Sequence, residues 1–224
     1  MRDHLLVLGW NDKARAAILN FLFDPRHEST DVVVVAQLKT APMDDPRVRF
    51  VRGTPGKANN LRRASAQDAG AAIVMATDPS DPRSDHESAL VVAALRRLNQ
   101  EVPIAVELID NENGEHLQYA GCNALIDTSG TVANLLVRSV QDMGVSDVVT
   151  ELLSSETGSE LYRVSIPDEF LGRTYREYLL AMLEAEAASV IGLAREDGNL
   201  LNPPPDTVLL ESDDAFVVSR EPPR

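Results

Sequence analysis

Short apolar runs alternate with amphipathic segments over the first two thirds of the chain. Leu5–Leu8 and the β-branched run Asp31–Gln37 predict strands, and the helix between them begins at Asn11 or Asp12. The alternation continues with predicted strands Val48–Val51, Ala71–Ala76, Ile104–Leu108 and Ala124–Ile126, and with predicted helices Lys57–Asp68, Ser84–Leu98 and Asn113–Tyr119. Apolar runs without polar alternation are typical of strands buried on both faces. The pattern predicts an α/β fold with a doubly wound parallel sheet.

From Thr131 onward the pattern changes to two consecutive helices, Thr131–Met143 and Val145–Leu153, which Gly144 separates. The apolar stripe on the first of them needs a partner, because nothing else in this segment can bury it. The stripe consists of Val132, Leu135, Leu136 and Val140.

A polar linker, Ser154–Ser159, leads into a smaller α+β module. Its predicted elements are the helix Tyr175–Leu183 and strands near Leu161–Ile166, Ser189–Ala194, Asn199–Leu201 and Ala215–Ser219. We therefore predict an N-terminal lobe over 1–130, two crossover helices over 131–154 and a C-terminal lobe over 155–224.

Charge and composition exclude several classes of function. The 21 Lys and Arg residues oppose 35 Asp and Glu residues, so the formal net charge is −14, and such a field repels nucleic acids and anionic membrane surfaces. No apolar run approaches the roughly 20 residues of a membrane-spanning helix, so we expect no direct membrane insertion. One cysteine, Cys122, excludes an internal disulfide and fits a cytosolic setting.

The segment Gly9–Ala14 lies where a Rossmann-like dinucleotide fold places its glycine-rich turn. Gly9 can form the tight turn, and the helix start can hold an anion, but Asn11 replaces the second glycine. Gln37 stands where an acid would accept the ribose hydroxyls of NAD, so standard NAD recognition is weakened. Two interpretations of the turn stay open. It binds an adenine nucleotide or NAD, or it is only a strand-to-helix connection that comes with the fold. The candidate cofactor-binding residues are Gly9, Trp10, Asn11, Asp12, Gln37, Gly53 and Thr54.

Acidic residues follow the fourth and fifth predicted strands. Asp78 and Asp85 come after the fourth strand and Asp110 after the fifth, at the sheet edge where ligands usually bind. Converging carboxylates suit calcium, which takes six to eight oxygen ligands. The same residues also cap helices, so either a calcium site or simple capping explains them.

Signals for catalysis are weak. The four histidines are scattered, and the chain contains neither an HExxH zinc motif nor a GxSxG nucleophile elbow. We therefore predict that the protein is not an enzyme, with an NAD-dependent oxidoreductase as the less favoured alternative.

Several motifs taken in order resemble the RCK (KTN) domains that regulate potassium channels and transporters, and the Castor/Pollux type is the nearest variant. The motifs are His4–Trp10, Val51–Pro55, Ala71–Met75, Val106–Leu108, Gly198–Pro203 and Leu210–Val217. The resemblance implies a non-catalytic, ligand-sensing gating-ring domain of a cation channel for potassium or calcium, controlled by calcium or a nucleotide. The alternative is a separate nucleotide-binding subunit of a potassium transporter.

The resemblance also implies partners and sites. The crossover helices would pair two subunits through Val132, Leu135, Leu136, Val140, Val149 and Leu152. Such homodimers would assemble into a tetrameric or octameric ring below a channel pore domain, on the cytoplasmic face of the membrane. Asp78, Asp85 and Asp110 match acidic positions of the family, but Met75 and Ile109 depart from its archaeal calcium-gated pattern.

Overall fold

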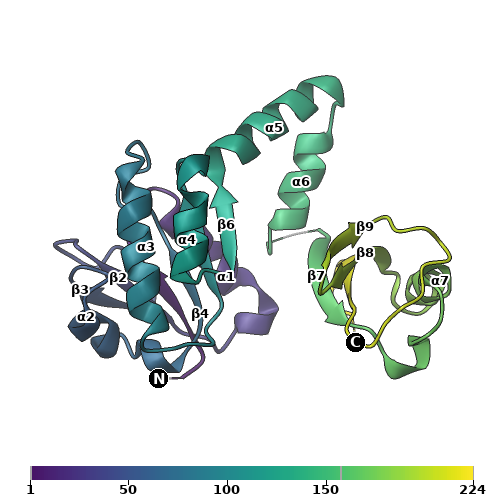
Figure 1. Cartoon of the computed structure of the whole chain (residues 1–224), viewed down its shortest axis with the longest axis horizontal. Helices are drawn as coiled ribbons and strands as arrows, with labels where there is room; N and C mark the ends of the chain where they lie inside the picture. Colours follow the sequence, from purple (N-terminus) through teal and green to yellow (C-terminus); the bar gives the residue numbers. More distant parts are fainter. Residues whose placement is uncertain (1, 157, 224) are drawn as a thin grey trace. The chain divides into compact units, whose positions relative to one another are not determined.

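The structure is a computed structural model that describes residues 2–156 and 158–223. The chain divides into two compact units, Met1–Gln141 and Asp142–Arg224 (Figure 1). This boundary lies between the two helices that the sequence grouped into one crossover segment. The three-part division into 1–130, 131–154 and 155–224 therefore stays a prediction.

The first unit contains a six-stranded parallel sheet with the order β3-β2-β1-β4-β5-β6. The strands are β1 (His4–Leu8), β2 (Val32–Ala36), β3 (Val48–Arg52), β4 (Ala69–Val74), β5 (Ile104–Leu108) and β6 (Ala124–Asp127). The strand order reverses direction at β1 and β4, so their carboxyl ends form the switch point at which such sheets bind ligands. The predicted α/β fold is confirmed.

Helices cover both faces of this sheet, because alternate residues of each buried strand point to opposite sides. On one face, α1 (Ala14–Phe23) packs through Ile18 and Leu22 against Leu5 and Val7. On the other face lie α2 (Ala58–Arg63), α3 (Arg83–Arg96) and α4 (Gly114–Ala120). Short 3-10 turns complete the unit at η1 (Pro25–His27), η2 (Ala66–Asp68) and η3 (Asn111–Asn113).

The predicted helix Lys57–Asp68 is interrupted. It ends at Arg63, and Ser65 then takes up the left-handed conformation at φ 53° before the η2 turn begins. Hydrophobic spacing does not reveal such a break, because Leu61 and Ala66 both still reach the core.

The second unit is built on a four-stranded antiparallel sheet with the order β7-β10-β8-β9. These strands are β7 (Glu160–Ser165), β8 (Ser189–Arg195), β9 (Gly198–Leu201) and β10 (Asp214–Ser219), and η4 (Asp168–Phe170) precedes the helix α7 (Tyr175–Glu186). Tyr178 and Met182 of α7 pack on Val190 and Val217 of the sheet. Thr174 and Glu177 form a reciprocal capping box that fixes the start of α7. The predicted small C-terminal α+β lobe is present.

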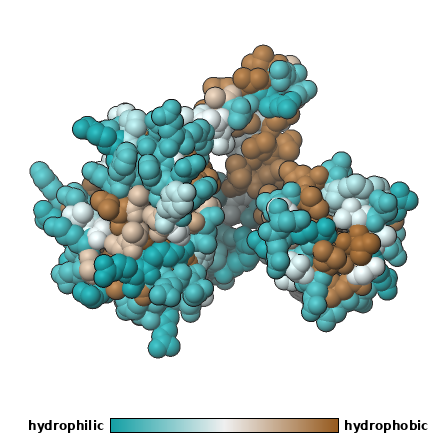
Figure 2. All heavy atoms as spheres, in the orientation of Figure 1, coloured by the Kyte–Doolittle hydropathy of each residue, from teal (hydrophilic) through white to brown (hydrophobic). Residues whose placement is uncertain are grey.

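The helices α5 (Thr128–Gln141) and α6 (Val145–Leu153) contain no buried residue. Val132, Leu136 and Val140 are exposed, while Leu135, Val149 and Leu152 are only partly buried. Figure 2 shows hydrophobic side chains gathered over both helices. Neither helix covers its apolar stripe within its own unit. Among the described residues, no helix combines the length and the hydropathy that a membrane span requires.

Candidate functional site

Two adjoining cavities open at the carboxyl edge of the parallel sheet. Their volumes are about 360 Å³ and 220 Å³, and they share Gln37, Pro55 and Thr77 as lining residues. The larger cavity lies between the ends of β1 and β4 and the middle of α3, and the smaller one is lined by Gly9 and Trp10. We call the two together the edge cleft. Its position is the switch point at which doubly wound sheets bind ligands.

Gly9 brings the first strand close to the fourth. Its φ is 97°, and a Cβ at this position would lie 2.5 Å from the Met75 carbonyl oxygen. Any other residue would therefore strain the turn and push β4 away. Gly9 is the one element of a dinucleotide turn that this geometry requires.

A polar network lies under the turn that follows Gly9. The Glu107 side chain is 5% exposed and ends at the same sheet edge. Its Oε2 accepts hydrogen bonds from Asn11 Nδ2 at 2.7 Å and from the Ala76 backbone N–H at 3.0 Å. Its Oε1 pairs with Lys13 Nζ at 2.6 Å. A buried carboxylate is tolerated here because three donors satisfy it.

This network decides which ligand chemistry the turn can accept. The Asn11 side chain points inward, donating to the Ala76 carbonyl at 3.0 Å as well as to Glu107, and its Oδ1 accepts the Lys13 N–H. Ala14 N–H is also taken, by the Asn11 carbonyl. The ammonium of Lys13 is already paired with Glu107, so the turn offers no unpaired cation to a phosphate. The turn is therefore poorly suited to a pyrophosphate.

The other predicted cofactor residues divide into two groups. Trp10, Gln37 and Thr54 line the edge cleft, and Gln37 Nε2 donates to Thr54 Oγ1 at 3.2 Å. Asn11, Asp12 and Gly53 are not among its lining residues. Gly53 is needed for packing, because a Cβ there would collide with the amide of Asn60.

The predicted metal ligands are not gathered into one site. Asp85 is buried, and it accepts the backbone N–H groups of Ile109 at 3.0 Å and Asp110 at 2.9 Å, together with Asn113 Nδ2 at 3.1 Å. Asp85 thus fastens the start of α3 to the loop after β5. Its oxygens are engaged with donors inside the protein rather than directed at an open cavity.

Asp78 and Asp110 each fold back on their own loop. Asp78 accepts from the Ser80 hydroxyl and N–H, and these hydrogen bonds hold the pKa of Asp78 below its usual value. Asp110 accepts the Glu112 N–H. Within residues 2–156 and 158–223, no group of three or more His, Cys, Asp or Glu side chains is placed to hold a metal ion. Of the three carboxylates, only Asp110 caps a helical turn, while Asp85 ties two segments together and Asp78 closes its own loop. Calcium stays a prediction.

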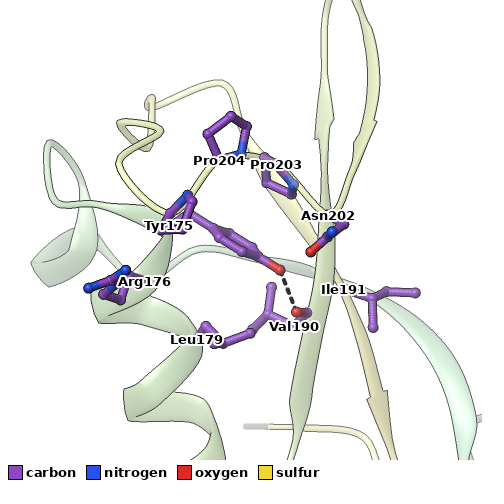
Figure 3. Close-up of a pocket in the computed structure, with 9 residues that line it drawn as sticks. Tyr175, Arg176, Leu179, Val190, Ile191, Asn202, Pro203 and Pro204 are labelled. Atoms are coloured by element: carbon purple, nitrogen blue, oxygen red, sulfur yellow. Dashed lines mark hydrogen bonds between the residues drawn. The ribbon is translucent and has the colours of Figure 1, made fainter.

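A larger cavity, of about 640 Å³, lies in the second unit between α7 and the proline-rich loop after β9 (Figure 3). Tyr175 forms one wall, and its hydroxyl donates to the Val190 carbonyl at 2.6 Å. Burial raises the pKa of Tyr175. Because the hydroxyl is already satisfied, the cavity offers mainly apolar surface.

The sequence did not predict the ion pair between Lys13 and Glu107. They are 94 residues apart, and neither lies in a motif that requires the other. A buried acid at the end of a parallel strand is the one signal that points to such a pair, because it requires a donor from a neighbouring strand end.

The order of the sheet, with a cleft at its switch point, defines a Rossmann-like domain. Residues 1–106 match the family model described as the calcium-activated potassium channel slowpoke-like RCK domain. This match confirms the resemblance to RCK domains that the motifs predicted.

Curated relatives match along most of the chain. The putative potassium channel protein YugO of Bacillus subtilis (strain 168) is 24% identical over 97% of this chain and 66% of its own length. The probable ion channel POLLUX of Oryza sativa subsp. japonica is 25% identical over 98% of this chain and 24% of its own length. The chain therefore spans only part of these relatives.

The solved structure of the human SLO3 gating ring has the same fold. It aligns with a TM-score of 0.69 over 96% of this chain and 44% of that chain, at 16% sequence identity. At this identity the likeness supports the fold alone.

Proposed function

We propose that the protein is a ligand-sensing regulatory domain of a cation channel, acting on the cytoplasmic side of the membrane and without catalytic activity. The match to an RCK family model and the ion-channel relatives support this class. The observation that carries the proposal is the edge cleft, which opens at the switch point of the sheet beside Gly9.

The ligand that fits this cleft best is an adenine nucleoside or monophosphate. The walls formed by Pro55, Val91 and Trp10 offer apolar contact for a flat base. The Gln37 amide can bond a ribose hydroxyl if it releases Thr54. A diphosphate or NAD would bring its pyrophosphate towards the Glu107 carboxylate, so we expect these to bind more weakly.

Ligand binding can act on a channel only if the protein assembles. We propose that two chains pair through the exposed stripe of α5 and α6, and that these dimers form the ring below a pore. Linkage then requires the ligand to favour one arrangement of the ring by about 1–3 kcal/mol, the usual size of such couplings.

A thermal-shift titration tests the ligand. Adenosine and AMP should raise the melting temperature of the full chain, and ADP and NAD should raise it less, because a ligand that prefers the folded state stabilises it. Gln37→Ala should reduce the shift. Lys39→Ala, which changes a residue outside the cleft, is the matched control.

Calcium forms a separate arm of the same titration. A calcium-dependent shift that Asp78→Asn or Asp110→Asn removes would favour the metal over the nucleoside. A melting temperature that no nucleoside, nucleotide or calcium changes would contradict the proposed function.

A further inference from the structure

One segment of this acidic chain carries only positive charge. Pro46–Gln67 contains Arg47, Arg49, Arg52, Lys57, Arg62 and Arg63 and no acidic residue, although the whole chain has a net charge of −14. The second unit, in contrast, has 17 acidic residues against 6 arginines, a formal net charge of −11. The overall charge therefore hides a strong local reversal.

Two of the six cations form ion pairs within the protein. Arg47 Nε lies 3.9 Å from Asp45 Oδ1, and Arg49 Nη2 lies 3.5 Å from Asp31 Oδ2. The other four, Arg52, Lys57, Arg62 and Arg63, are exposed and form no ion pair among the described residues. Their charge is available to a partner.

One of these four cations lines a groove between α2 and α3. Arg62 lines it together with Arg97 of α3, and the volume of the groove is about 540 Å³. Arg63, the last residue of α2, reaches with Nη1 to the Arg52 backbone carbonyl at the end of β3, at 3.5 Å. Small apolar side chains, among them Ala93 and Ala94, also line the groove, and Leu90 beside them is 72% exposed.

We infer that this face, which we call the α2 face, binds the surface of a bilayer that contains anionic phospholipids. Four to eight Lys or Arg side chains on one surface are typical of such contacts, and each contributes about fivefold in partitioning. Leu90 and the groove add apolar contact for the interfacial part of the lipid. The inference rests on the proposed function, which puts the protein beside a membrane.

Charge also selects which surface makes this contact. The α2 face is attracted to an anionic surface within about one Debye length of roughly 10 Å, whereas the net charge of −11 makes the second unit unsuited to it. Glu87, on α3 one turn before Leu90, faces the neighbouring edge cleft. The competing occupant of the α2 face is an acidic protein segment, including the second unit of another copy.

Co-sedimentation with vesicles tests the inference. The full chain should bind vesicles in which about a third of the phosphatidylcholine is replaced by phosphatidylserine, bind pure phosphatidylcholine much less, and lose binding as salt is raised. Arg62→Gln with Arg97→Gln should weaken binding roughly 25-fold, at about fivefold for each cation. Arg15→Gln on α1, which covers the opposite face of the sheet, is the matched control and should leave binding unchanged.

Three results would overturn the inference. The first is equal binding to both kinds of vesicle, or to neither. The second is unchanged binding by the double variant. The third is salt-sensitive self-association, measured by light scattering without vesicles, that the double variant abolishes, because this would assign the α2 face to a second copy. Thermal shifts with adenosine in the same variants should stay intact, so failure here is distinct from failure of the proposed function.

Discussion

Two buried carboxylates, Glu107 in the first unit and Asp213 in the second, are held in different ways. In the second unit, Asp213 is buried and receives two parallel hydrogen bonds from Arg195, at 2.8 Å and 2.6 Å, together with the Leu210 N–H at 2.9 Å. In the first unit, Glu107 receives one ammonium from Lys13, whose side chain is 49% exposed, and two neutral donors.

This difference indicates two roles. A carboxylate held in fixed geometry is a structural charge, whereas one whose cation can be drawn away by a ligand is a responsive charge. The fork of Arg195 matches a carboxylate with two bonds in fixed geometry, so this pair holds β8 to the turn before β10. Lys13 is a single point charge on a half-exposed side chain at the start of α1, so a ligand at the turn can compete for it. We infer that Asp213 serves stability and that Glu107 controls ligand charge.

The largest expected effect follows removal of the structural carboxylate. Asp213 and Arg195 form a mostly buried ion pair, and Asp213→Ala leaves the Arg195 guanidinium without its partner. The free energy of unfolding should therefore fall by about 3 kcal/mol. Urea denaturation of the full chain measures this change. Asp214→Ala, one residue further on, removes an exposed pair with Arg163 and should cost less than about 1 kcal/mol. Equal losses for the two variants would contradict the assignment.

A smaller effect is expected from pH in the first unit. His4 is buried, its Nε2–H donates to the Ala64 carbonyl, and burial lowers its pKa below 6.5. Since the folded protein favours neutral His4, this contribution to stability is present above pH 6.5 and is lost as the pH falls through the lowered pKa. Asp213, whose pKa the hydrogen bonds from Arg195 lower below 3.8, loses its contribution only in stronger acid.

Urea denaturation between pH 7.5 and pH 5 separates the two groups. His4→Gln keeps a donor for the Ala64 carbonyl but does not titrate, so its unfolding free energy should change less with pH over this range. An unchanged slope would show that another group is responsible.

The fold was predictable because its signals are local. The unbroken apolar run Val32–Ala36 indicates a strand buried on both faces, and the helix spacing of Ile18 and Leu22 places α1 on the sheet. The break at Ser65 was not predictable, because a left-handed residue leaves no trace in hydrophobic spacing.

The site was predictable only in part, because its decisive contacts join distant strands. Gly9 could be found from its place after the first strand, but the partners of Glu107 come from two other loops. Asp85 has the residue type of a metal ligand, yet it binds backbone N–H groups of the loop after β5. Composition misled in a similar way, since a net charge of −14 conceals the basic run Pro46–Gln67.

The smallest stability effect, and the sharpest test of the comparison, comes from neutralising the responsive carboxylate. Glu107→Gln keeps an oxygen to accept the Asn11 and Ala76 donors but releases Lys13, so the unfolding free energy should fall by only about 1 kcal/mol. The freed ammonium and the lost negative charge should together favour phosphates at the turn. A gain of about 1.4 kcal/mol would make ADP bind roughly tenfold more tightly, while adenosine should bind as before.

Isothermal titration of ADP and adenosine into the variant and the unmodified protein measures this selectivity. Glu87→Gln is the matched control, because it removes the same charge from the wall of the edge cleft without touching the turn. If ADP gained equally in both variants, general electrostatics would explain the effect. If ADP gained in neither, Glu107 would be as purely structural as Asp213, since its charge would then have no influence on what the turn accepts.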